Sequence, residues 1–553
     1  MSSSLLDVQP KIDGPLPAAL EGLKPAGLWS VFGKLASLPR PSKHEDRVLE
    51  WLESYAAAHG LKWRRDSLNN TVIYRPGSGG GESAPPVIIQ GHVDVVTEKN
   101  DDTTHDFFTQ GVSLLREGDW VTADGTTLGA DNGIGVAAAL ALLAAPPSAS
   151  LPPLEVLLTT DEEAGMGGAM GLDGGMLSGR TLLNLDTEEW GEIYIGCAGG
   201  GDSRLLLDVP LEPVPPGLAF LSLRVVGLLG GHSGMNIGEG RGNAVRLLAR
   251  ALDAAGLEAP LALAAAGGGD KRNAIAREAS AAFGVPAAAK PAVLEALRRV
   301  EREAKEEFGT LETGLRFEID DLAPDAAPAA AFAPDAAARL VTLLLALPHG
   351  PIKYSHAVEG LVETSNNVAS LKTLSKEDVE AVQGKKGETV DLATSSEAPP
   401  PPSSSSSAAA AFSPSALGES HVVLDVTCST RSSVDPALTA ARRAIARLGA
   451  LAGARVLQES RYPGWAPTPE APVIKAAARA LRAVTGREPG LKAIHAGLEC
   501  GLLREKIPGV QCVSYGPTIT GAHSPDEKVQ ISTVEPFFKA TAILLEQLAK
   551  VKA

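Results

Sequence analysis

The feature that most constrains the fold of this chain is a set of short, continuous apolar segments separated by segments of helical pattern. Residues 86–90, 154–159 and 181–186 are apolar at most positions and end in polar residues. Such segments predict strands that are buried on both faces of a sheet. Residues 28–60 and 132–145 have the apolar spacing of helices. Strands that alternate with helices predict an α/β unit.

A different pattern begins after Gly199. Segments 203–209 and 220–226 alternate apolar and polar residues, and the helical segments 243–256 and 291–308 follow. This combination predicts a second unit of the α+β class, and the α/β pattern returns from about residue 463. We therefore predict an N-terminal extension at 1–27, an α/β domain in two parts at 28–200 and 463–553, and an inserted domain at 201–462.

One stretch of the inserted domain has low complexity. Residues 395–415 contain a run of four prolines, five consecutive serines and a run of alanines, and the charged residues 376–391 precede them. Such a composition buries too little apolar surface to fold. We predict a disordered insertion at 375–419; the alternative is a structured surface loop.

Composition narrows the partners and the compartment. The formal charge of −16 argues against nucleic acid and anionic membranes as partners, since both require clustered Lys and Arg. No apolar run is long enough to cross a bilayer, and the N-terminus lacks a basic segment followed by an apolar one. The cysteines are widely spaced and form no CxxC pair, which argues against a disulfide scaffold and a thiolate zinc site. We expect a cytoplasmic protein. The four cysteines are Cys197, Cys428, Cys500 and Cys512.

Histidine and carboxylate side chains follow the predicted strands. His92 and Asp94 come after the first strand, and residues two apart in an extended chain point to the same side. A carboxylate beside an imidazole fixes its tautomer and increases its basicity for a metal. Asp131 precedes Asn132-Gly133 at the start of a predicted helix. That pattern is also common in turns and helix caps, so each of these signals is weak when taken alone.

Further acids lie where the next strands end. Residues 161–163 are three successive carboxylates, which repel one another unless a cation or a proton relieves them; a solvated loop is the alternative. Asp186 ends another strand, at the edge where open α/β sheets bind ligands. His523 lies in a loop framed by Gly and Pro. Together, these histidines and acids suit two divalent ions that share a carboxylate.

Several blocks of this sequence resemble those of a known family. They occur in that family's order and read GHVDVV, TTLGADNGIG, TDEEAGMGGAMGL, GGHSG, HAGLECGL and GPTITGAHSPDE. The chain resembles the M20 metallopeptidases, and among them the aminoacyl-histidine (Xaa-His) dipeptidases, from about Leu28 to its C-terminus. The resemblance implies an α/β, zinc-peptidase-like catalytic domain with a central, mostly parallel sheet. It also implies that the inserted α+β domain is a lid and dimerisation domain.

The resemblance also implies roles for the metal-site residues. Each subunit would bind two divalent ions, with Zn²⁺ expected first and Mn²⁺ or Co²⁺ as alternatives. Asp94 would orient His92, and Glu162 would be the general base that takes a proton from the attacking water. Asp131 would bridge the two ions. The implied ligands are His92 and Asp186 for one ion, Glu163 and His523 for the other, and Asp131 for both.

Other residues are implied to contact the substrate. His232 would reach the active site of the partner subunit and stabilise the oxyanion, whereas a His in a tight Gly turn is the alternative. The residues implied to bind the substrate are Asn273, Arg277 and Arg431 at its carboxylate and Glu499 at its amino-terminal side. The chain departs from the family at Ala276 and Ala522, where proline is usual.

These observations favour a metallopeptidase that hydrolyses short unblocked dipeptides, including Xaa-His dipeptides such as carnosine, as a homodimer. An N-acyl amino acid amidohydrolase or a broader aminopeptidase is the alternative on the same scaffold. A non-catalytic binding protein is the remote alternative, because the complete set of expected ligands and the base is present.

Overall fold

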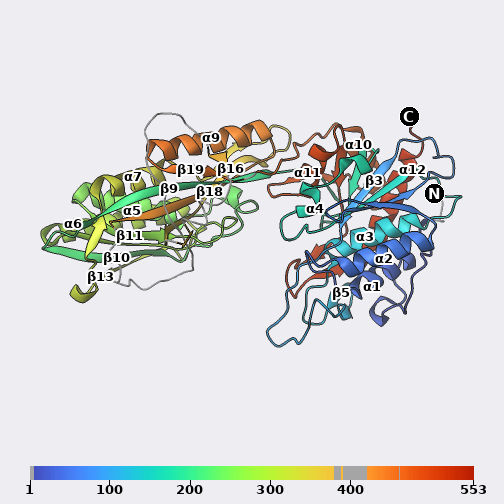
Figure 1. The fold of residues 1–553 in the computed structure, drawn as a ribbon, viewed down its shortest axis with the longest axis horizontal. Coiled ribbons are helices and arrows are strands. Elements are labelled where there is room, and N and C mark those ends of the chain that lie inside the picture. The colour runs from blue at the N-terminus through green and yellow to red at the C-terminus, as the bar shows by residue number, and fades with distance from the viewer. Residues whose placement is uncertain (1–4, 376, 379–387, 390–419, 460, 553) are drawn as a thin grey trace. The chain divides into compact units, whose positions relative to one another are not determined.

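The computed structural model describes residues 5–375, 377–378, 388–389, 420–459 and 461–552 (Figure 1). Most of the insertion predicted at 375–419 lies outside these residues. The chain divides into two compact units, which are described separately. Unit 1 comprises Met1–Cys197, Trp465–Ala493 and Leu498–Ala553, and unit 2 comprises Ala198–Gly464 and Ile494–Gly497. The extension expected at 1–27 and the domain boundaries expected at 200/201 and 462/463 stay predictions.

Unit 1 is built on an eight-stranded sheet in the order β1-β2-β6-β3-β7-β21-β8-β20. The four strands β6, β3, β7 and β21 pair in parallel, whereas β1, β2 and β8 pair antiparallel. These parallel strands lie next to one another in the middle of the sheet, where they are almost wholly buried. The strands are β1 Lys62–Arg65, β2 Thr71–Arg75, β3 Val87–His92, β6 Leu154–Thr159, β7 Thr181–Asn184, β8 Glu192–Cys197, β20 Gly490–Ile494 and β21 Gln511–Ser514.

Helices cover this sheet. The Ala-rich helix α3 packs on β3 and against α1, while α10 packs on β21 and against α12 (Figure 1). The helical pattern at 28–60 forms two helices rather than one, because Pro39 and Pro41 interrupt it. The helices are α1 Ala26–Ala36, α2 Asp46–Ala58, α3 Ala130–Leu143, α4 Gly167–Met170, α10 Pro472–Thr485, α11 Glu499–Lys506 and α12 Ile531–Leu548.

A separate four-stranded sheet in unit 1 has the order β22-β23-β5-β4. Its strands are β4 Leu114–Glu117, β5 Trp120–Ala123, β22 Ile519–Thr520 and β23 Lys528–Gln530. Strands β22 and β23 form an antiparallel hairpin, and β23 also pairs with β5. The hairpin connection, residues 521–527, carries His523 and is fixed at both ends by this sheet.

In the part of unit 2 that the structure describes, an eleven-stranded sheet packs with four helices. Alternate side chains of β9 and β10 face the helices, and Leu205, Leu207, Leu221 and Leu223 share one core with α5. The strands are β9 Gly199–Pro213, β10 Leu218–Val226, β11 Ala262–Gly268, β12 Ala279–Pro286, β13 Arg316–Asp321, β14 Ala330–Phe332, β15 Gly350–Tyr354, β16 Val362–Leu374, β17 Glu388–Thr389, β18 His421–Ser432 and β19 Arg455–Gln458. The helices are α5 Ala244–Glu258, α6 Lys290–Phe308, α7 Pro334–Ala346 and α9 Asp435–Leu451.

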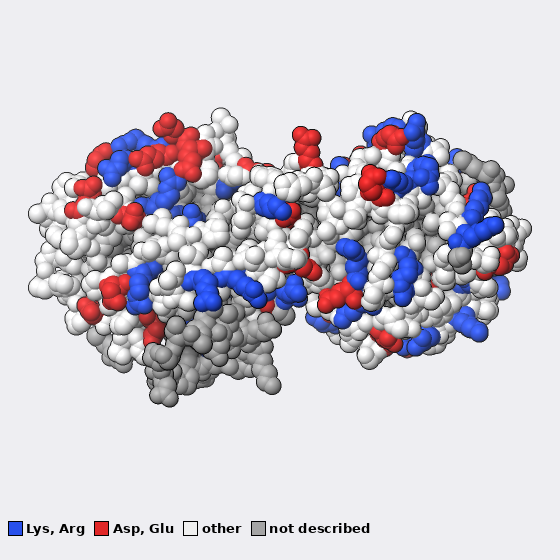
Figure 2. Space-filling view, turned by 90° about the horizontal axis from the view of Figure 1, so that it is seen from above, with Lys and Arg blue, Asp and Glu red and all other residues white. Residues whose placement is uncertain are grey.

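The predicted α/β architecture with an inserted α+β unit is confirmed by these two units. Figure 2 shows basic and acidic side chains interspersed over the face in view, without a continuous basic surface on it. Among the described residues, no helix is long and apolar enough to cross a membrane. The four cysteines are buried and free.

Candidate metal centre

Three neighbouring strands bring candidate ligands to one edge of the sheet. His92 is the last residue of β3, which pairs in parallel with both β6 and β7. Glu163 lies four residues after β6 and Asp186 lies two residues after β7. The carboxyl ends of parallel strands meet at the same edge, so these side chains converge there. Asp131 at the start of α3 and His523 in the β22–β23 hairpin complete the set.

The five side chains form two groups that share Asp131. His92 Nε2 lies 3.0 Å from Asp131 Oδ1 and 3.3 Å from Asp186 Oδ1. His523 Nε2 lies 3.3 Å from Asp131 Oδ2 and 3.0 Å from Glu163 Oε2. In each group, one ligand atom from every residue lies within 4.8 Å of the others. Each oxygen of Asp131 therefore faces a different histidine, as a carboxylate that bridges two ions requires.

The charges of this cluster fit a cationic ligand. Burial raises the pKa of Asp186 and of Glu163, because it disfavours the charged form, and the nearby charge of Asp131 adds to both shifts. Burial also acts to raise the pKa of Asp131, but hydrogen bonds with His523 and His92 outweigh it and lower that pKa. Hydrogen bonds to Asp131 and Glu163 raise the pKa of His523 to about 11. Divalent cations can replace these protons as the positive charges that the acids need.

The buried carboxylate of Asp94 holds parts of the cluster in place through hydrogen bonds. Its side chain is fully buried, and its carboxylate accepts hydrogen bonds from Ser42 Oγ at 2.8 Å and from the N–H groups of Glu162 at 3.0 Å and Glu163 at 3.1 Å. Asp94 Oδ1 lies 3.6 Å from His92 Nδ1. Asp94 thus holds the turn that carries Glu162 and Glu163 next to His92. This contact with the turn comes in addition to the orientation of His92 that the resemblance implies.

Glu162 lies beside the ligands. One of its carboxylate oxygens lies within 4.8 Å of ligand atoms of His92 and Glu163. Burial and the neighbouring carboxylates of Asp186 and Glu499 raise the pKa of Glu162 well above its ordinary value, although His92 opposes them. A raised pKa suits a group that must accept and then release a proton near neutral pH.

Glu499 lies in the core beneath this edge of the sheet. It is fully buried, and its Oε2 accepts hydrogen bonds from Gln90 Nε2 at 2.6 Å and Thr159 Oγ1 at 2.7 Å. Burial raises the pKa of Glu499 to about 8. Its Oε1 has no hydrogen-bond partner among the described residues. A contact between Glu499 and the substrate stays a prediction.

The other expected substrate residues belong to unit 2. Arg431 is buried, and its guanidinium donates to the Tyr462 hydroxyl at 3.0 Å and lies 3.4 Å from Ser233 Oγ. Asn273 and Arg277 are exposed, and Arg277 Nε donates to the Leu228 carbonyl at 3.2 Å.

His232 has a defined pattern of hydrogen bonds. Its Nδ1 accepts the N–H groups of Gly234 at 3.2 Å and Met235 at 3.1 Å. Burial and the charge of Arg431 lower its pKa. The neutral ring therefore carries its proton on Nε2, which remains available as a donor.

Two residues near the centre were not singled out by sequence reasoning. The Glu527 carboxylate accepts hydrogen bonds from four consecutive backbone N–H groups, those of residues 128–131. Arg40 is buried and donates to the carbonyls of Val93 and Gly129. Glu527 ends the GPTITGAHSPDE block and could have been suspected from it, whereas Arg40 lies between two prolines and carries no such signal.

Comparison with known proteins gives consistent matches. The model of peptidase family M20/M25/M40 matches residues 88–547. The chain is 39% identical over 530 residues to the cytosol non-specific dipeptidase of Escherichia coli (strain K12), covering 96% of this chain and 99% of that protein. The crystal structure of aminoacylhistidine dipeptidase from Vibrio alginolyticus matches with a TM-score of 0.82 and 38% identity, covering 96% and 98% of the two chains.

A more distant structure shares the fold. The aminopeptidase PepT from Bacillus cereus matches with a TM-score of 0.55 and 14% identity, covering 95% of this chain and 98% of that chain. The family match spans more than half of the chain and includes all five residues of the cluster. This chain therefore belongs to peptidase family M20/M25/M40.

Proposed function

We propose that this chain is a metal-dependent dipeptidase that hydrolyses unblocked dipeptides, including Xaa-His dipeptides. The observation that carries the proposal is the pair of His–carboxylate groups that share Asp131, with Glu162 beside them. The E. coli and Vibrio relatives, both named as dipeptidases, match nearly the whole chain and support this substrate class. The name of the E. coli relative also supports a cytosolic location.

Two divalent ions are the cofactors of this proposal. His92 and Asp186 would hold one ion, Glu163 and His523 the other, and Asp131 both. Nitrogen and oxygen ligands without thiolates suit Zn²⁺, which we propose as the metal, and also Mn²⁺ and Co²⁺. Such ions supply Lewis-acid chemistry, because they polarise a carbonyl and make water a better nucleophile.

Glu162 would move the proton. Its carboxylate lies beside the ligand atoms without belonging to either group that contains Asp131. It would accept a proton from the attacking water and give it to the leaving amine. The buried carboxylate of Asp94 holds the backbone of residues 162 and 163, so the base and its neighbouring ligand keep a fixed spacing.

Arg431 would bind the C-terminal carboxylate of the dipeptide. Among the described residues, no carboxylate lies within ion-pair distance of this buried guanidinium, which donates hydrogen bonds to the hydroxyl groups of Tyr462 and Ser233. A buried cation without a counterion is costly, and a substrate carboxylate would relieve that cost through charge-assisted hydrogen bonds. Asn273 and Arg277 would assist at the same end of the substrate, and Glu499 would shape the amino-terminal side.

His232 would act at the metal centre of the partner subunit in a homodimer. Unit 2 would serve as the lid and dimer contact, and His232 of one subunit would donate from Nε2 to the developing oxyanion at the other subunit's metal centre. The two backbone N–H groups that occupy Nδ1 support this tautomer. A donor aimed at an oxyanion contributes about 3 kcal/mol to catalysis.

The substrate class can be tested with carnosine, Gly-His, Ala-Leu, a tripeptide and an N-acetyl amino acid. Each would be incubated with the protein in Zn²⁺, in Mn²⁺ and in chelator. We expect metal-dependent cleavage of the dipeptides alone. Cleavage of the N-acetyl compound alone would favour the amidohydrolase alternative, cleavage of the tripeptide would favour a broader aminopeptidase, and no cleavage would favour a binding protein.

The base can be tested by Glu162→Gln. We expect kcat to fall by about 10²–10⁴-fold, because a general base contributes that much, while both ions remain bound. Asp161→Asn is the matched control, since it also removes one carboxylate from the turn and Asn tolerates the positive φ of that residue. Loss of both ions from Glu162→Gln, measured by metal analysis after dialysis, would contradict the assignment.

The carboxylate site can be tested by Arg431→Met. We expect KM for a dipeptide to rise by about 10–100-fold, as the loss of a hydrogen bond to a charged group predicts. The same dipeptide with an amidated C-terminus is the control, and its KM should change little. An equal rise for both substrates would show that Arg431 only supports the fold of unit 2.

The role of His232 across a dimer can be tested by complementation. His232→Ala and Glu162→Gln would each be nearly inactive alone. Mixed subunits restore one complete site per heterodimer, so activity should return to about a quarter of the wild-type value when exchange is random. If the mixture stays inactive although mass measurements show heterodimers, His232 does not act on the partner's site.

A further inference from the structure

The turn that carries Asp131 is held by a buried carboxylate. Glu527 Oε2 accepts the N–H groups of Leu128 at 2.7 Å and Gly129 at 2.9 Å, and Oε1 accepts those of Ala130 at 2.8 Å and Asp131 at 3.1 Å. The side chain of Glu527 is 2% exposed. These four N–H groups lie in the turn that leads into α3, where Asp131 and Asn132 have non-helical φ/ψ angles, so the carboxylate supplies partners that no helical carbonyl provides.

Glu527 belongs to the same hairpin as His523. It lies four residues after His523, directly before β23, and its backbone carbonyl accepts the Thr122 hydroxyl of β5 at 2.8 Å. Its N–H donates to the Ser524 carbonyl at 3.1 Å. Glu527 therefore connects the hairpin of one candidate ligand, His523, to the turn of another, Asp131.

Arg40 holds the same turn from a different segment. Its Nη2 donates to the Gly129 carbonyl at 2.7 Å, and its Nη1 donates to the Val93 carbonyl at 2.9 Å. The Arg40 carbonyl accepts the N–H of Val95 at 3.1 Å. Val93 directly follows His92. Arg40 therefore connects the segment of His92 to the turn of Asp131.

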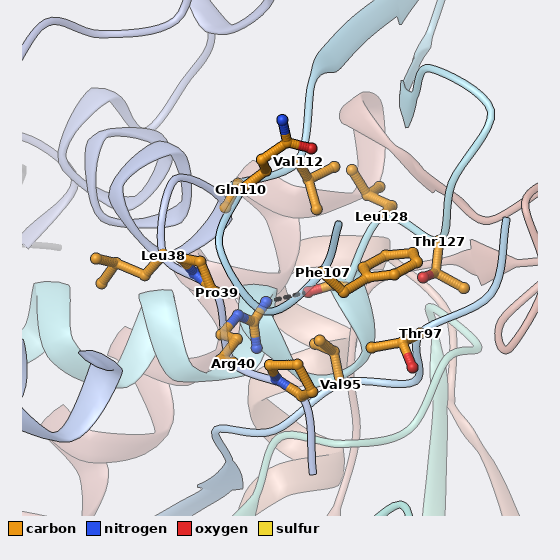
Figure 3. A pocket seen from close by; sticks show the side chains of 13 residues that line it. Leu38, Pro39, Arg40, Val95, Thr97, Phe107, Gln110, Val112, Thr127 and Leu128 are labelled. Atoms are coloured by element: carbon orange, nitrogen blue, oxygen red, sulfur yellow. Dashed lines mark hydrogen bonds between the residues drawn. The ribbon is translucent and has the colours of Figure 1, made fainter. Parts of the chain in front are cut away.

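Arg40 lies between a pocket and the glycines of the turn that carries Asp131. Arg40 lines a small pocket together with apolar side chains such as Pro39, Val95 and Phe107 (Figure 3). A Cβ atom added at Gly129 or Gly133 would lie 2.8 or 2.6 Å from Nη2, which is closer than side chains pack. Glycine at these positions lets the guanidinium approach the turn.

The positive charge of Arg40 also interacts with the acids of the metal centre. Among the described residues, no carboxylate lies within ion-pair distance of it. Burial lowers its pKa to about 10, and the charges of Glu527, Asp94, Asp131 and Glu163 act against that shift. Arg40 is therefore cationic at neutral pH, and its charge offsets part of the repulsion among the acids.

We propose that Arg40 and Glu527 are positioning residues, which fix the position of the bridging Asp131 carboxylate relative to each of the two ions. Arg40 fixes Asp131 relative to His92, and Glu527 fixes Asp131 relative to His523. Each residue therefore governs mainly one of the two metal groups. This inference rests on the two-metal site of the proposed function. It adds, for each ion, a separate residue that controls how tightly the ion is bound.

Site-resolved metal binding tests the inference. The metal-free full-length protein would be titrated with Mn²⁺ and with Zn²⁺ by calorimetry, and His92→Ala and His523→Ala would show which binding step belongs to which group. We expect Arg40→Met to weaken the step lost in His92→Ala by about 10–100-fold, the usual effect of removing a residue that supports a metal ligand. Glu527→Gln should weaken mainly the step lost in His523→Ala.

Two buried residues away from the metal centre are matched controls. Arg75 is 6% exposed and donates to backbone carbonyls, and Glu155 is 5% exposed and accepts the N–H groups of Ser178 and Gly179. Arg75→Met and Glu155→Gln should leave both binding steps unchanged. Circular dichroism of the metal-free proteins would report whether each variant folds. Arg40→Lys and Glu527→Asp would replace any variant that does not, because they keep the charge but cannot span the same backbone groups.

The outcomes separate the inference from the proposed function. A wild-type protein that binds no metal would overturn the proposed function. A wild-type protein that binds two ions, with variants that bind both as tightly or lose both equally, would overturn the positioning roles alone. Selective loss of one step in each variant would establish them.

Discussion

Repulsion among buried carboxylates is the constraint on which the functional half of this structure depends. Asp131, Glu163 and Asp186 are held close together with little access to water, and two histidines lie among them. Such a cluster costs free energy in a folded chain unless positive charge enters it. Protons, or the two cations of the proposed function, would supply that charge, and the buried contacts of Asp94, Glu527 and Arg40 keep the acids in place.

The scaffold meets this constraint by distributing the ligands over elements that are far apart in the sequence. Strand β3 supplies His92 from the centre of the parallel part of the sheet, and its two neighbours lead into Glu163 and Asp186. The hairpin of His523 comes from a different sheet. Because these candidate ligands lie on separate elements, the tertiary fold of unit 1 brings them together.

Sequence reasoning predicted three central strands of unit 1, β3, β6 and β7, and the polar residues that follow them, because apolar runs and charged residues have strong local patterns. Residues 154–159 match β6 at both ends. The two prolines that divide the first helical segment were visible but were not given enough weight. Arg40 could not be predicted, since its role comes from contacts with the carbonyls of Val93 and Gly129, which are distant in sequence and carry no side-chain signal.

The two histidines of the metal centre differ in their access to solvent. The side chain of His92 is 1% exposed, whereas that of His523 is 57% exposed and lies at a hairpin turn. An ion held by His92 would be shielded from water on the side of that histidine, while an ion held by His523 would be bordered by water. The two positions would therefore exchange metal at different rates. One ion would be a durable part of the protein, and the occupancy of the other would follow the supply of free metal in the surroundings.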